Sequence, residues 1–511
     1  MIARQRDKWL CGVWLCSLWL GLMGMELLGA GQAALQAAET RPNIVWIIAD
    51  DMSANFACYG ETAFETPHVD RLAAEGVQFR HAYVTAPVCS TCRSAFITGM
   101  YQTSIGAHHH RSGRGEQKIT LPPDVRLVPE LFQQAGYYTT ISGWPVVAQR
   151  LGKTDYNFQW DEAIYDGNDW AGRQPNQPFF AQIQISGGKL RGADAAGWDK
   201  VGQTAEELFG SRTQTAAVKL PPYYPQHPDV VRDWAAYLDA VRVTDATVGE
   251  VRGRLEREGL LDNTLVLFMT DHGISHARGK QFLYDEGLHV PLVIRGPGIT
   301  PGSLRDDLVE HIDIAALSLA AAGIAIPESM WARDILAADY QPRQAVFAAR
   351  DRCDETVDHI RSVRTADFKY IRNFLPQRPY LQPCAYKDGK QILIALRQWH
   401  QAGKLDAVQE LLFRQQRPAE ELYDLRSDPH EIHNLADDPQ HAATLQAMRQ
   451  RLEAWMEHTD DQGRTSESPA MYDSDMAVYL ASSQGRRGDP ARLKILQDNI
   501  ALMKRWAAEG K

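Results

Sequence analysis

The sequence lacks the features that define several common classes of protein. Its 511 residues contain only 7 cysteines, and Cys11 and Cys16 lie close to the N-terminus. The five that remain (7 − 2) are too few for a disulfide scaffold, although a bridge between Cys353 and Cys384 is worth testing. A net charge of −10 argues against nucleic acid as a partner. The chain also has no internal repeat or low-complexity linker, which excludes solenoids and strings of small modules.

The N-terminus has the pattern of an export signal. A basic segment that ends at Lys8 precedes an apolar stretch, and small residues at 30–38 offer cleavage sites. We therefore predict a signal peptide over residues 1–38 and a mature protein that is periplasmic or secreted. The apolar stretch is long enough for an uncleaved membrane anchor. The small residues favour cleavage, after which no stable membrane insertion is expected.

The rest of the chain alternates between buried strands and helices. Continuous apolar runs are typical of strands covered on both faces, and they lie at 43–49 and 264–269. Further strands are expected at 179–185 and 290–295. Caps and periodicity predict helices at 67–76, 230–259 and 311–323, the second as one long helix or two. This order predicts an α/β fold with a large mixed, mostly parallel sheet sandwiched by helices.

The pattern changes beyond about residue 360. Two short strands form a predicted hairpin at 360–364 and 368–372, and a further strand is expected at 421–425. A helix near 440–458 and a charged helical tail follow. We predict a smaller C-terminal α+β domain with an antiparallel sheet, and we place the division between residues 39–375 and 376–511.

Acidic residues follow two of the buried strands directly. Asp50 and Asp51 end the first run, and Asp271 and His272 end the second. Each fragment alone is more often a turn or a helix cap. In open α/β sheets, however, ligands bind at the carboxyl ends of the strands. Carboxylate oxygens suit a hard divalent cation, with calcium favoured and magnesium left open, whereas zinc prefers more histidine or thiolate.

A cysteine motif lies between these two fragments. Residues 89–93 read Cys-Ser-Thr-Cys-Arg and are expected on a short loop before a helix at 94–99. The spacing of Cys89 and Cys92 is also that of a redox dithiol or half a zinc site. No second pair and no thioredoxin-like unit follows, so we favour a nucleophile beside a metal site.

In this order the motifs resemble a sulfatase of the formylglycine-dependent type, within the alkaline-phosphatase-like superfamily. The sequence is similar to glycan sulfatases of the heparan N-sulfatase and arylsulfatase kind. The resemblance extends over nearly the whole mature chain. The segments that match the family are 41–43, 66–73, 89–99, 136–139, 178–180, 262–264, 271–273, 279–280, 290–292, 421–425 and 428–429.

The resemblance implies a role for each motif residue. In that family a separate maturation enzyme oxidises the motif cysteine to formylglycine, whose hydrate attacks sulfur. Cys89 would be the converted residue, and Arg93 would hold the diol or a ligand carboxylate through its planar fork of donors. Lys280 would meet a sulfate oxygen. The cation would be held, together with an oxygen of that hydrate, by Asp50, Asp51, Asp271 and His272.

The chain departs from the family pattern at several positions. Thr91 stands where the family has proline or, less often, alanine. This motif is what the maturation enzyme recognises, so two outcomes stay open: Cys89 is converted to formylglycine, or it stays a thiol. Lys153 takes the place of the family's next lysine, and Asp155 stands where a histidine is usual. Another family histidine is missing after the strand at 179–185.

Two features offer replacements for the missing histidines. Lys189 could serve as a cation or as an acid for the leaving group, and its alternative is a plain surface lysine. The triplet at 108–110 could supply an imidazole, for which His110 is our candidate, or it could be a solvated loop. A charged stretch at 350–355 is a further candidate as the rim of a sugar site, with an ion-paired surface loop as its alternative.

A sulfate ester carries its negative charge on peripheral oxygens, so its cleavage requires preorganised cations around them. The metal, Arg93, Lys153 and Lys280 would supply these cations. We predict hydrolysis of sulfate esters or N-sulfate on a sulfated polysaccharide or oligosaccharide. The alternatives are a phosphoesterase or phosphonate hydrolase of the same superfamily, and a non-catalytic glycan-binding protein if Cys89 is not converted.

Overall fold

The structure is a computed structural model that describes residues 41–485 and 490–511. The predicted signal peptide lies outside these residues. The chain divides into the units Met1–Pro42 and Asn43–Lys511, and every helix and strand that the structure describes belongs to the second. None of the described helices is both long and apolar enough to cross a membrane.

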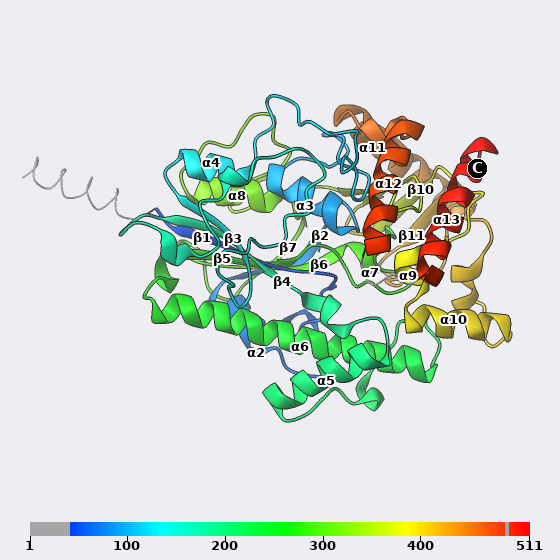
Figure 1. Cartoon of the computed structure of the whole chain (residues 1–511), viewed down its shortest axis with the longest axis horizontal. Helices are drawn as coiled ribbons and strands as arrows, with labels where there is room; N and C mark the ends of the chain where they lie inside the picture. The colour runs from blue at the N-terminus through cyan, green and yellow to red at the C-terminus, as the bar shows by residue number, and fades with distance from the viewer. Residues whose placement is uncertain (1–40, 486–489) are drawn as a thin grey trace, which may run out of the picture. The chain divides into compact units, whose positions relative to one another are not determined.

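The larger sheet runs through the middle of this unit (Figure 1). Within the described residues it has seven strands in the order β3-β4-β1-β5-β6-β2-β7. The strand β6 is antiparallel to β5 and β2, and the other neighbours are parallel. The mixed, mostly parallel sheet predicted from the sequence is therefore confirmed. Its strands are β1 (Asn43–Ala49), β2 (Val77–Tyr83), β3 (Tyr138–Gly143), β4 (Phe179–Ile185), β5 (Thr264–Thr270), β6 (His289–Arg295) and β7 (Ser303–Glu310).

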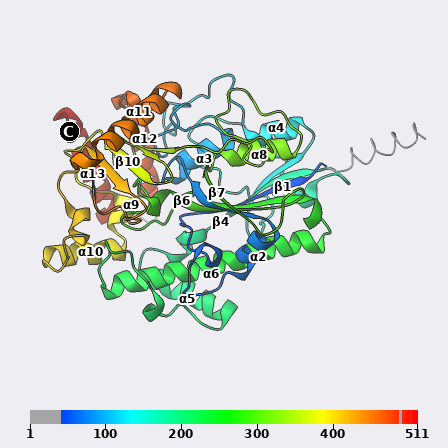
Figure 2. The same cartoon turned by 180° about the vertical axis from the view of Figure 1, so that it is seen from behind.

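Helices cover both faces of this sheet (Figures 1 and 2). Alternate residues of β1 enter two separate cores, with Trp46 on one side and Ile47 on the other. Full burial of an apolar side chain contributes about 1.5 to 3 kcal/mol, which explains why every residue of β1 after Asn43 is apolar. One face is covered by α3 (Cys89–Thr98), α4 (Val128–Gln134) and α8 (Asp313–Ala321), and the other by α2 (Pro67–Glu75), α5 (Ala195–Phe209) and α6 (Pro228–Arg257).

The predicted helices are present, with shifts at their ends. Gly76 caps α2, and α6 is one continuous helix. The helix α8 begins at Asp313, two residues later than predicted. The helix α3 begins at Cys89, so our placement of this residue on a loop before residue 94 was wrong. The amide of Cys92 already donates to the carbonyl of Val88, which closes the first helical turn.

The smaller sheet is antiparallel, as predicted, and has the order β11-β10-β9-β8 in the described residues. The helix α11 (Ala442–His458) contacts β9 and β10. The predicted boundary near residue 375 falls between β10 and β11, so the sheet draws strands from both sides of it. Its strands are β8 (Val346–Arg350), β9 (Ile360–Arg364), β10 (Phe368–Asn373) and β11 (Glu420–Asp424), and the nearby helices are α9 (Ala385–Asp388), α10 (Gln391–Gln401), α12 (Pro469–Gly485) and α13 (Pro490–Ala508).

The five cysteines that the structure describes are all free thiols. The bridge that we considered between Cys353 and Cys384 is therefore absent. The side-chain amide of Gln281 lies 2.9 Å from the Cys353 sulfur and 3.5 Å from the Cys384 sulfur, and donates to both. Packing rather than disulfide bonds stabilises this part of the molecule.

Candidate active site

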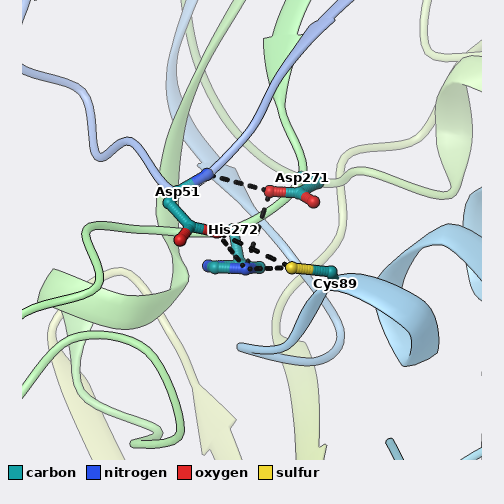
Figure 3. A group of neighbouring side chains, drawn as sticks. All are labelled: Asp51, Cys89, Asp271 and His272. Carbon is teal, nitrogen blue, oxygen red and sulfur yellow. Dashed lines mark hydrogen bonds and ion pairs between the residues drawn. The ribbon is translucent and has the colours of Figure 1, made fainter. Parts of the chain in front are cut away.

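Four buried side chains converge where β1 and β5 end. Their ligand atoms all lie within 4.8 Å of one another. Figure 3 shows the four side chains: Asp51, Cys89, Asp271 and His272. The register explains the convergence, because β1 pairs with β5 up to Ala49 and Thr270, and both strands then end at the same edge.

The orientation of His272 fits a metal ligand. Its Nδ1 lies 2.8 Å from the carbonyl oxygen of Gly273, a contact in which Nδ1–H donates. This leaves Nε2 as the ring atom that faces Asp51 Oδ1 at 3.1 Å and Asp271 Oδ1 at 3.6 Å. Metal-binding histidines are commonly fixed through their other nitrogen in this way. The carboxylate oxygens and the imidazole suit a divalent cation, so these residues fit the ion that we expect.

The charge around His272 also favours a cation. Burial opposes protonation of the ring, but Asp271 and the Cys89 sulfur outweigh it and raise the pKa of His272 to about 9. Two carboxylates and a sulfur atom surround one buried imidazole, and isolated buried charges are costly. A positive charge, on a proton or on a metal ion, is therefore favoured at this position.

The sulfur of Cys89 lies close to several cationic side chains. It marks the position that the reacting oxygen of a formylglycine hydrate would take. Lys280 Nζ is 3.1 Å from this sulfur, and Lys189 Nζ is 3.8 Å away. Burial opposes ionisation of the thiol, but Lys153, Lys189 and Lys280 together lower the pKa of Cys89 to about 7. An anionic group at this position is thus stabilised by its surroundings.

Three of the predicted cations converge on Asp50. Lys189 Nζ lies 2.6 Å and Lys153 Nζ 3.1 Å from its carboxylate oxygens, and Arg93 completes the set. Burial opposes ionisation, but Lys153, Arg93 and Lys189 hold the pKa of Asp50 well below its usual range. The oxygens of Asp50 accept from these three side chains in the structure, and its role as a metal ligand stays a prediction.

The same cations differ in their access to solvent. Arg93 is buried and also contacts Asp271, at 3.2 Å. The side chains of Lys153 and Lys189 are 29% and 36% exposed. The two lysines can therefore reach a substrate, whereas Arg93 holds the carboxylates in place.

Lys189 is part of this group rather than an ordinary surface residue. It follows β4 in a short 3-10 helix, Gly187–Arg191. Burial disfavours its charge, but Cys89, Asp51 and Asp50 outweigh this effect and raise the pKa of Lys189. An effective general acid has a pKa near the working pH. The structure therefore favours Lys189 as a fixed cation over its alternative role as an acid.

His110 lies beside the nucleophile helix. Its Nδ1 is 2.7 Å from the hydroxyl of Ser90, and its Nε2 is 3.7 Å from Asp354. His108 and His110 are both buried. The reading of the triplet as a solvated loop was therefore wrong. Ser90 is the neighbour of Cys89, so His110 stays our candidate for an imidazole near the substrate.

The charged stretch at 350–355 does not form an open rim. All six residues are buried. Arg350 pairs with Asp358, and Arg352 pairs with Glu467 and Asp475. The sequence analysis placed this stretch on the surface, either as the rim of a sugar site or as an ion-paired loop, and both predictions were wrong. The ion pairs allow its charged residues to pack inside the protein.

Sequence reasoning missed two contributors to the site. The hydroxyl of Tyr386 on α9 lies 3.5 Å from Asp51 Oδ2, and its ring lies 5.1 Å from Lys280 Nζ. Gln184 on β4 accepts a hydrogen bond from Arg93. Tyr386 lies 335 residues from Asp51 along the chain, and no motif around it suggests a role. Gln184 interrupts an apolar strand and could have been noticed.

The mixed sheet with acidic residues and a cysteine at its edge is the arrangement of the alkaline-phosphatase-like fold. A family model described as Sulfatase matches residues 42–324, more than half of the chain. A second model, described as N-sulphoglucosamine sulphohydrolase, C-terminal, matches residues 272–380. The chain belongs to the sulfatase family and is a sulfuric ester hydrolase.

Curated relatives support this assignment over most of the chain. An ulvan-active sulfatase of Formosa agariphila is 33% identical over 498 residues, which cover 90% of this chain and 82% of the relative. The human N-sulphoglucosamine sulphohydrolase is 26% identical, with 84% of this chain and 92% of the relative covered.

Solved structures share the fold. A protein in complex with its substrate D-glucosamine-2-N,6-O-disulfate gives a TM-score of 0.55 at 20% identity, with 82% of this chain and 98% of that chain covered. A phosphonate monoester hydrolase of Agrobacterium radiobacter gives a TM-score of 0.59 at 16% identity, with 82% and 96% covered. At these identities the likeness concerns the fold alone.

The metal site predicts the effect of removing one carboxylate. Asp51→Asn keeps the shape of the side chain but removes a charged ligand. We expect a divalent cation to bind more weakly by about 10-fold or more, because loss of even a residue that only positions a metal ligand weakens binding by about 10- to 100-fold. Calorimetric titration with calcium chloride and elemental analysis after dialysis measure this change.

Asp262→Asn is the matched control, because Asp262 is fully exposed and its ion pair with Arg295 contributes little. The control should bind the ion like the parent protein. Equal affinity in Asp51→Asn would remove Asp51 from the metal site.

Proposed function

We propose that this sulfatase removes sulfate from a sulfated polysaccharide or oligosaccharide, as an ester or as N-sulfate, with a formylglycine made from Cys89 and a bound calcium ion. The observation that carries the proposal is the group of three lysines near the Cys89 sulfur. Lys280 and Lys189 lie within 4 Å of this atom, and Lys153 shares the carboxylate of Asp50 with Lys189.

This arrangement suits the charge of a sulfate group. The negative charge of a sulfate ester is spread over its peripheral oxygens, and fixed cations stabilise it best where water is excluded. Lys280 is buried against Asp51 at 3.2 Å, so its position is fixed before a substrate arrives. Lys153 and Lys189 face the solvent and would meet the remaining sulfate oxygens.

Formylglycine would supply the nucleophile. Its hydrate carries two hydroxyl groups, one for attack on sulfur and one whose deprotonation releases the sulfate, which a serine cannot provide. Lys280 and His272 lie 3.1 and 3.2 Å from the sulfur of Cys89 and can influence the ionisation of a group at this position. Position 89 is also the first residue of α3, where the helix dipole favours negative charge.

Calcium is the cation that we favour. Asp51, Asp271 and His272 would hold it, together with Asp50 and an oxygen from residue 89. When bound, the ion would neutralise charge that develops on the sulfate oxygens. Carboxylate oxygens are the ligands that calcium and magnesium prefer, and magnesium is the alternative.

Glycan substrates are supported by the relatives, among which are an ulvan-active sulfatase and an N-sulphoglucosamine sulphohydrolase. We propose that residues 1–38 are a signal peptide, that the protein is periplasmic or secreted, and that it has no stable membrane insertion after cleavage. Its further partner would be the enzyme that converts Cys89, and we expect no nucleic acid partner.

The proposal predicts turnover of sulfated glycans by protein that carries the converted residue. Sulfate release from sulfated polysaccharides, measured by ion chromatography, should exceed phosphate release from phosphate esters by at least about 100-fold in kcat/KM. Cys89→Ala should release no sulfate. Faster phosphate or phosphonate cleavage would favour the phosphoesterase alternative. Binding without turnover by fully converted protein would favour a glycan-binding protein.

Maturation provides a separate prediction. Thr91 lies in the first turn of α3, where proline is tolerated. Thr91→Pro restores the family pattern, and we expect a larger converted fraction in a host with the maturation enzyme. Peptide mass spectrometry across Cys89 measures it as a loss of about 18 Da, the change from thiol to aldehyde. Thr91→Val is the control. An unmodified thiol in all three proteins would contradict the formylglycine proposal.

A further inference from the structure

A cavity of about 360 Å³ opens beside the catalytic cations. Asp50 and Lys153 line one part of it. Other parts are lined by the end of β4, including Ser186, and by the segment 143–152 that connects β3 to Lys153. Sites for small ligands begin at about 300 Å³, so the cavity has room for one sugar unit next to the reacting group.

The segment 143–152 is held in place by hydrogen bonds at both ends. The indole N–H of Trp144 donates to Glu250 on α6 at 2.6 Å, and the amide of Gly152 donates to the carbonyl of Ile141 on β3 at 3.0 Å. Between them, the side chain of Asn168 donates to two carbonyls of the segment, one of them that of Arg150 at 3.1 Å. A wall fixed in advance loses little conformational entropy when a ligand binds.

The segment presents an apolar surface to the cavity. Trp144 and Val147 both line it. Val147 is 53% exposed, which makes it one of the few large hydrophobic residues at the surface of the described chain. Aromatic and aliphatic side chains of this kind pack against the apolar face of a sugar ring.

Arg150 adds a positive charge to the same cavity. Its guanidinium makes no ion pair or hydrogen bond with any residue that the structure describes. Nearby arginines differ, because Arg114 pairs with Asp155 and Arg111 pairs with Asp354. A free guanidinium fits the two oxygens of a carboxylate or a sulfate.

We propose that this cavity is the subsite for the sugar unit next to the sulfated one, and that Arg150 binds an anionic substituent of that unit, a carboxylate or a second sulfate. The inference rests on the proposed action on sulfated glycans and adds a residue that selects among them. Trp144 and Val147 would support the ring, and Lys153 marks the boundary with the sulfate that is removed.

The test compares the kinetics of Arg150→Ala on three sulfated disaccharides, whose neighbouring sugar carries a carboxylate, a second sulfate or no charge. For the charged substrates we expect KM to rise by about 10-fold or more, the effect of losing a charge-assisted hydrogen bond, with kcat changed less than about twofold. The neutral disaccharide should keep its KM. Arg150→Lys keeps the charge but lacks the planar fork of donors. Its KM for the charged substrates should therefore lie between those of the parent protein and Arg150→Ala.

Arg257→Ala is the matched control, since Arg257 is an exposed arginine at the end of α6. It should match the parent protein on all three substrates. The carboxylate and sulfate substrates separate the two sources of the anion, and an effect on either supports the subsite.

The outcomes distinguish this inference from the proposed function. If the parent protein cleaves the disaccharides and Arg150→Ala has an unchanged KM for both charged ones, the subsite is wrong while the glycan sulfatase stands. An equal rise in KM for the neutral disaccharide would also overturn the role of Arg150 as an anion site. A converted parent protein that cleaves a simple aryl sulfate and none of the disaccharides would overturn the proposed function and the subsite with it.

Discussion

Three buried carboxylates lie at one edge of the larger sheet, and cationic side chains neutralise their charge. Much of the fold brings these cationic side chains to that edge. Asp50, Asp51 and Asp271 are buried, and a buried charge that loses its partner costs about 3 to 5 kcal/mol. The partners come from segments far apart in the sequence: Arg93 from α3, Lys153 after β3, Lys189 after β4, and Lys280 and His272 after β5.

The pairing of Lys189 with Asp50 requires a close approach of two backbone segments. Gly187 and Gly188 bring the Lys189 segment against the backbone of Asp50 and Asp51, and a Cβ at either glycine would lie 2.2 Å from a carbonyl oxygen of that pair. Gly187 also has a φ of +54°, which favours glycine. The approach of β4 to β1 therefore fixes the distance at which Lys189 meets Asp50.

The sequence contains most of this centre in readable form. A strand buried on both faces is mostly apolar, so β1 and β5 were visible as runs. The residues that follow them meet because the two strands are parallel neighbours. The cysteine motif, Lys153 and Lys280 followed from the family resemblance, and Lys189 was proposed where the chain lacks a family histidine. The structure brings these residues together with Arg93. The antiparallel hairpin of the smaller sheet was equally visible from its alternation and turn.

Other features depend on tertiary contacts that leave no local pattern. Tyr386 reaches Asp51 only because α9 packs over the loop that holds Lys280, and nothing around Tyr386 indicates this. The stretch at 350–355 looked like a surface because charged residues are usually exposed, yet distant partners such as Glu467 allow its burial. The start of α3 at Cys89 was missed because Val88 offers no side-chain cap.

The central claim is that residue 89 carries the nucleophile and that the surrounding lysines hold the sulfate. Cys89→Ser supplies a hydroxyl at this position but lacks the second hydroxyl that would release the sulfate. Incubation of this variant with a glycan that the parent protein desulfates, followed by peptide mass spectrometry, should show a gain of about 80 Da on residue 89, a trapped sulfate ester. A sulfate group on another residue would contradict the account. So would a Cys89→Ser variant that binds the substrate but carries no sulfate on residue 89.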